Sequence, residues 1–174
     1  MFTNQRFGLF NDQKDRFIKA LIEYDLSIWF PNLRGQIKEN DYNNWFIAFV
    51  PGAWGQWKGA VYGVHFDMIY SRVKDKFRLC VGVENPMKYS FRQSFKENVI
   101  SRIMKAGIIQ SGFVLKAKDR VKLVEVDPIP FSPQSWQIIM ERYIGLQSVI
   151  TVIGEVVKEY YNHGAFDIYM DFPL

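Results

Sequence analysis

Hydrophobic and polar residues alternate most strictly in two neighbouring segments, 60–73 and 76–84. Successive side chains of a β-strand point to opposite faces, so each segment predicts a strand with one apolar side. The charged pair Lys74–Asp75 between them predicts a tight hairpin turn. The two apolar rows must share one face, because a one-residue slip in register would expose them all. These rows are Tyr62, Val64, Phe66, Met68 and Tyr70 on the first strand, and Phe77, Leu79, Val81 and Val83 on the second.

Three other segments show the apolar repeat of three to four residues that is typical of amphipathic helices. We predict one helix at Asn11–Trp29, with Asn11 or Asp12 as its N-cap, because their side-chain oxygens can accept free backbone N–H groups. A second helix is predicted at Ser90–Ala106, and Gly107 suits the left-handed residue that commonly follows a helix.

The third predicted helix begins near Trp136 and runs toward Tyr161. Ser132 or Ser135 can cap it, and Gly145 and Gly154 weaken its pattern because glycine lowers helix propensity. Either glycine can interrupt the helix.

Further strands are predicted at Asn44–Val50, Phe113–Lys118 and Val121–Val126, the last two turning at Asp119–Arg120. The order along the chain is then α-β-β-β-α-β-β-α. Strands clustered between helices predict an α+β fold, an antiparallel sheet of about five strands with helices packed on one face. With 174 residues, the chain is expected to form a single domain, 1–174.

Composition limits the functions that this fold can carry. Aromatic residues make up 17% of the chain, and they supply either buried core area or stacking surfaces for a base or sugar. Cys80 is the only cysteine, so no intrachain disulfide can form, and we expect a cytoplasmic protein. With two histidines, neither a metal nor another cofactor is expected. No stretch reaches the roughly 18 apolar residues of a membrane span, so no membrane partner is expected.

The net charge of +4 permits contact with nucleic acid or another acidic partner. Eight basic residues can form a phosphate-binding patch if the second helix and the second hairpin lie side by side. A solvated polar face is the alternative. The candidates are Arg92, Lys96, Arg102 and Lys105, predicted on the polar side of the helix, and Lys116, Lys118, Arg120 and Lys122 on the hairpin.

The polar side of the central hairpin is predicted to carry His65, Asp67, Arg78 and Glu84. An imidazole, two carboxylates and a guanidinium are the groups that general acid–base catalysis uses. Cross-strand ion pairs on a solvated face are the alternative. If the protein is an enzyme, we expect His65, Asp67 and Glu84 to be catalytic, as in a divergent metal-dependent hydrolase. The lysine that nuclease sites of this kind carry two residues after the second acid is replaced by Pro86.

A glycine-rich loop at 51–59 carries Trp54, Trp57 and Lys58. Two indole rings beside a lysine can stack a base or close a pocket over a ligand. The alternative is that both tryptophans fold back over the edge of the sheet as part of the core.

The segments Tyr62–Asp67 and Phe77–Glu84 resemble uncharacterised C-terminal accessory regions of bacterial PD-(D/E)XK restriction-type nuclease proteins. The resemblance implies an accessory or recognition domain in a phage-defence or mobile-element context, without catalytic residues of its own. We therefore expect a non-enzymatic module that contacts nucleic acid or a protein partner. The alternatives are a divergent metal-dependent hydrolase and an immunity or inhibitor protein.

Overall fold

The structure is a computed structural model, and it describes residues 4–24, 28–30, 44–51, 64–71, 73–83, 87–119 and 122–167. Several predicted site residues lie outside this part of the chain. They are Trp54, Trp57, Lys58, Glu84 and Arg120.

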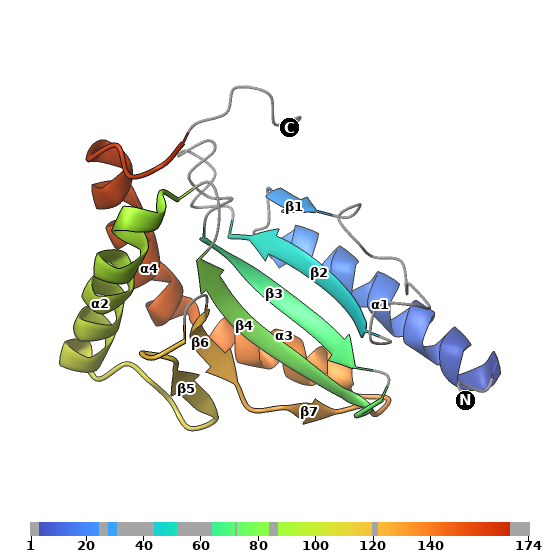
Figure 1. The fold of residues 1–174 in the computed structure, drawn as a ribbon. Coiled ribbons are helices and arrows are strands. Elements are labelled where there is room, and N and C mark those ends of the chain that lie inside the picture. Colours follow the sequence, from blue (N-terminus) through green and yellow to red (C-terminus); the bar gives the residue numbers. More distant parts are fainter. Residues whose placement is uncertain are drawn as a thin grey trace.

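Helices and strands follow one another in the predicted α+β arrangement (Figure 1). Their bounds are α1 Asn4–Tyr24, β1 Ile28–Phe30, β2 Asn44–Val50, β3 Val64–Ser71, β4 Lys76–Val83, α2 Tyr89–Ala106, β5 Phe113–Leu115, β6 Lys122–Val126, β7 Ile129–Pro130, α3 Ser135–Gly145 and α4 Gln147–Asn162. All strand pairs are antiparallel, in the spatial order β1-β2-β3-β4-β6-β5, and the short β7 pairs with β4. The α+β prediction, with helices packed against an antiparallel sheet, is confirmed.

The central hairpin β3–β4 has the predicted register. Phe66 lies opposite Val81 and Tyr70 lies opposite Phe77, so the two apolar rows share one face. We call this the inner face. The members of both apolar rows that the structure describes, from Val64 to Tyr70 on β3 and from Phe77 to Val83 on β4, are fully buried. The turn contains Asp75 in the left-handed conformation, with φ of 51°, which aspartate tolerates better than most residues. The predicted turn and the predicted buried rows are therefore confirmed in the described part of the hairpin.

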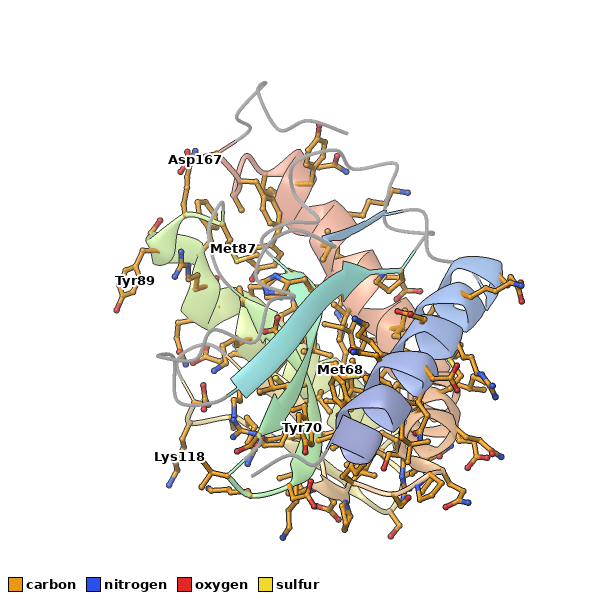
Figure 2. The ribbon with its side chains drawn as sticks, turned by 90° about the vertical axis from the view of Figure 1, so that its right-hand side faces the viewer. Met68, Tyr70, Met87, Tyr89, Lys118 and Asp167 are labelled. Carbon is orange, nitrogen blue, oxygen red and sulfur yellow. The ribbon has the colours of Figure 1, made fainter. Side chains whose placement is uncertain are left out.

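Aromatic rings hold the inner face to the helices. The ring of Phe77 lies 4.8 Å from that of Trp136 in α3, 4.8 Å from that of Tyr70 and 6.3 Å from that of Phe10 in α1. Figure 1 shows α1 and α3 behind the sheet, and Figure 2 places Tyr70 in the interior of the molecule. These aromatic residues are therefore part of the core and do not form a stacking surface for a ligand.

The first helix differs from its prediction at both ends. It begins at Asn4 rather than at a cap near Asn11, and it ends at Tyr24. The turn that contains Phe10 belongs to the helix because this ring packs against the inner face. Ile28 and Trp29, predicted as helical, belong to β1, which pairs with β2. A three-residue strand has too short a pattern to be recognised without its partner.

The predicted long C-terminal helix is two helices that meet at Leu146. Gly145 is the last residue of α3, and a Cβ atom there would lie 3.3 Å from the Gln110 side chain and 3.6 Å from the Phe113 ring. Leu146 is buried and has a φ of −86° and a ψ of 1°, which redirects the chain into α4. The break therefore falls where α3 lies close to β5, and Gly145 leaves room there for both side chains.

The other helix ends follow the sequence more closely. Gly107 has a φ of 63° after α2, as predicted. The predicted serine cap of α3 is wrong, because the N-cap residue is Gln134 and no side chain caps the helix. The Ser135 hydroxyl instead organises the preceding turn, since it accepts the N–H of Ser132 at 2.6 Å and donates to the Pro130 carbonyl at 2.9 Å. Among the described residues, no helix is long and apolar enough to cross a membrane.

Candidate functional site

The outer face of the sheet is the side opposite to the buried apolar rows. The strand order places β6, rather than β5, directly beside β4. Asp67, Cys80 and Glu125 therefore form one row across three neighbouring strands. This pairing places β6, from the second predicted hairpin, next to the polar side of the central hairpin.

Glu125 lies at the centre of a cluster of basic side chains. Its carboxylate oxygens lie 2.9 Å from Nζ of Lys116, 3.0 Å from Nζ of Lys122 and 3.8 Å from the Arg78 guanidinium. We call these four residues the Glu125 cluster. Burial raises the pKa of the Glu125 carboxyl, but the hydrogen bonds and the charges of Lys116 and Lys122 together outweigh burial and hold this pKa below its ordinary value. The carboxylate is therefore charged at neutral pH.

A β-bulge makes this cluster possible. Residues three apart in a regular strand point to opposite faces, so Lys122 and Glu125 should not meet. The register shifts where β6 passes Val81 and Gly82, and Lys122 pairs with Gly82 while Glu125 pairs with Cys80. Both side chains thus lie on the outer face. The N–H of Lys122 also donates to Asp119 at 2.8 Å, which fixes the start of β6.

A groove of about 670 Å³ runs along the outer face next to the Glu125 cluster. It is lined by the turn of the central hairpin, by β4 and by the strands β5 and β6. Its charged lining residues are Lys74, Lys76, Arg78 and Lys116 on the basic side, and Glu125 and Asp127 on the acidic side. Lys74 and Lys76 are exposed. Within the described residues, no ion pair is found for either of these two lysines.

The predicted acid–base set is only partly brought together. Nε2 of His65 lies 3.4 Å from Asp67, and their side chains are 11% and 17% exposed. Arg78 lies opposite Ile69 and reaches Glu125, so it belongs to the neighbouring cluster. Glu84 lies outside the described residues, so the hydrolase site that includes it stays a prediction.

Cys80 lies between the two acidic residues of the row and is 3% exposed. Burial, with a smaller contribution from Asp67, raises the pKa of its thiol to about 12. The thiol is therefore protonated at neutral pH and is a poor nucleophile. In the described part of the chain, no three His, Cys, Asp or Glu residues are grouped so that they could hold a metal ion.

Lys96 was predicted on the polar side of its helix, and this prediction is wrong. The residue is 1% exposed, and its Nζ has no hydrogen-bond partner in the described structure. Because α2 packs against both α4 and β6, it buries more than the single apolar stripe that its sequence suggests. Burial lowers the pKa of the Lys96 ammonium, and the charge of Asp119 offsets part of that effect.

The remaining basic residues of α2 serve different local roles. Arg102 makes a two-pronged hydrogen bond to Glu159 of α4, at 2.8 and 2.7 Å. Arg92 donates to the Met87 carbonyl at 3.0 Å and lies over the ring of Tyr89, which Figure 2 shows at the surface. Lys105 is exposed. Of the predicted basic residues on the second hairpin, Lys116 lines the outer-face groove. Lys122 contacts Glu125, which lines the groove as well.

Sequence reasoning missed the central role of Glu125 and the contributions of Lys74 and Lys76. The two lysines could have been found from the charged hairpin turn, since Lys74 belongs to it and Lys76 follows it on the polar side of the second strand. The contact between Glu125 and Lys122 could not be found in this way, because local alternation predicts that the two side chains point to opposite faces of the sheet. Only the bulge and the position of β6 beside β4 bring these groups together.

The fold and the outer face define the class of this protein as an α+β domain with a helix-covered sheet face and a charged, grooved sheet face. Comparison of the chain with protein-family models, with curated proteins and with solved structures finds no match in any of the three.

Proposed function

We propose that this domain binds nucleic acid through the outer-face groove. The observation that carries the proposal is the excess of basic over acidic side chains in its lining, four against two. Lys74 and Lys76 are exposed there, and within the described residues neither forms an ion pair with a carboxylate. Their ammonium groups are thus available to an external anion.

The chemistry of the groove suits a phosphate backbone. Lysine and arginine that contact phosphates release condensed counterions, which drives binding without regard to sequence. The guanidinium of Arg78 keeps donors that its distant contact with Glu125 does not use. Val73 and Val114 add exposed apolar surface to the lining, at 74% and 44% exposure, and such surface can contact sugars or bases.

The wider role follows from the sequence. Trp54 and Trp57 would stack bases of a bound strand, and Lys58 would contact its phosphates. On the resemblance described above, the domain would act as a non-enzymatic recognition module in bacterial defence or on mobile elements.

The test compares two double variants by fluorescence anisotropy with single-stranded and double-stranded nucleic acid. K74Q/K76Q removes two groove cations, and K105Q/K158Q removes the same charge from exposed positions on α2 and α4. If both groove lysines contact phosphates, the plot of log K against log salt should flatten by about 0.9 per contact, or about 1.8 in total. The control should bind nearly as the wild type does.

Two results would reject the proposal. One is the lack of salt-dependent binding of either nucleic acid by wild-type protein at micromolar concentration. The other is an equal loss of affinity in both double variants, because net charge rather than the groove would then explain binding. A stoichiometric protein partner found together with the first result would favour the interaction-factor alternative.

A further inference from the structure

We infer that Glu125 is a built-in competitor of the ligand phosphate, occupying a phosphate-binding position between Lys116, Lys122 and Arg78. This inference rests on the proposed nucleic-acid binding and deepens it. It assigns a specific anion subsite to one wall of the groove, and it identifies the residue that limits affinity there.

The geometry of the Glu125 cluster is that of a bound anion. Three basic groups approach one carboxylate from three elements: Arg78 from β4, Lys116 directly after β5, and Lys122 from β6. The two lysine distances, 2.9 and 3.0 Å, are typical of charge-assisted hydrogen bonds, which a phosphate oxygen would make equally well. Without the carboxylate, three cations would face one position.

The cluster opens toward ligand rather than into the core. Glu125, Lys116 and Arg78 all line the groove. The lysine and arginine side chains are 33% and 41% exposed, and the carboxylate is 15% exposed. A phosphate that enters the groove therefore meets these cations with Glu125 already in place. Lys116 and Lys122 contribute little to binding while the carboxylate holds them.

The variant E125Q removes this competing charge with little change of shape. It should release both lysines, so nucleic acid should bind more tightly, with a larger gain at low salt. The plot of log K against log salt should steepen by about 0.9 for each released lysine, or about 1.8 in total. The matched control is E141Q on α3, an exposed glutamate whose carboxylate accepts from Gln137. It loses the same charge and should leave the slope unchanged.

A second measurement separates this inference from the proposed function. Inorganic phosphate, titrated in a thermal-melt assay, should raise the Tm of E125Q in a saturable way and leave that of E141Q unchanged. If nucleic acid binds neither wild type nor E125Q but phosphate still stabilises E125Q, the proposed function is wrong and the anion subsite stands.

The inference itself is overturned if E125Q gains neither nucleic-acid affinity nor phosphate stabilisation, whether or not the wild type binds nucleic acid. The double variant K116M/E125Q guards against a folding defect caused by the unpaired cations. It removes the carboxylate together with one lysine, so it should show about half of the slope change. A double variant that matches the wild type in slope and in its response to phosphate would also overturn the inference.

Discussion

The two faces of the hairpin β3–β4 are built from the same alternating strands but are stabilised in different ways. On the inner face, Phe66 and Val81 pair across the strands with no exposed surface. On the outer face, His65 and Asp67 keep part of their surface exposed, and Nε2 of His65 lies 3.4 Å from the Asp67 carboxylate. The inner face excludes water through packing, whereas charges balance one another on the outer face.

This difference indicates where stability and function lie. A buried aromatic or aliphatic side chain contributes a few kcal/mol. A partly exposed ion pair contributes about 1 kcal/mol or less. Charges on the outer face can therefore be changed, or can exchange partners with a ligand, without loss of the fold. Most of the stability should come from the inner face.

Phe77→Ala tests this division with the largest expected effect. The ring contacts residues of α1, β3 and α3, and its removal leaves a cavity among aromatic side chains. We expect a loss of about 3–5 kcal/mol in the free energy of unfolding. Urea denaturation measures it. The control, Ile69→Ala, truncates a half-buried residue of the outer face and should cost less than half as much. Equal losses would contradict the division.

The inner face was predictable because its signal is local. Alternation over eight residues, a charged turn and a mirrored second strand determine register without knowledge of the remaining chain. The α+β class followed from the order of such elements. Gly107 was predictable for the same reason, since its left-handed conformation depends on the end of one helix.

The Glu125 cluster was not predictable, because it depends on long-range choices. Either strand of the second hairpin could have paired with β4, and the sequence does not state which one does. The bulge that turns Lys122 toward Glu125 depends on that pairing. The short β1 was missed for a similar reason, since Ile28–Phe30 becomes a strand only through β2.

Lys96 is an exception to the division between a packed interior and a charged surface. It is a cation that is buried without a hydrogen-bond partner in the described structure. Lys96→Met keeps most of the side-chain volume and removes the buried charge. We expect the free energy of unfolding to rise by about 1–3 kcal/mol, since an unpaired buried polar group costs about that much. The control, Lys105→Met, lies exposed on the same helix and should change stability by about 0.5 kcal/mol or less.

The pH dependence of stability gives an independent check on Lys96. Its pKa in the folded protein is lower than in the unfolded chain, so the unfolded state binds more protons between these two values. Stability should therefore rise with pH through that window, and the contribution of Lys96 is most unfavourable below it. Melts of K96M across alkaline pH should lack this rise. An identical pH profile in both proteins would show that the ammonium is not strained by burial.

Tyr70→Phe should give the smallest effect, and it tests how the inner face connects to the hairpin turn. The Tyr70 ring is buried, but its hydroxyl donates to Oδ1 of Asp75 at 2.6 Å. Losing this bond should cost about 0.5–1.5 kcal/mol, because Asp75 is partly exposed and the ring contacts with Phe77 remain.

A double-mutant cycle with Asp75→Gly separates the Tyr70 hydrogen bond from effects on the turn itself. Glycine tolerates the left-handed backbone of position 75 and removes the acceptor, so the backbone conformation should be retained while the bond is lost. If the two residues act through their shared bond, Y70F/D75G should cost less than the sum of the single variants. Strict additivity would mean that the hydroxyl contributes nothing through Asp75. In that case the turn conformation, rather than a link from the core, would hold the two strands in register at this end.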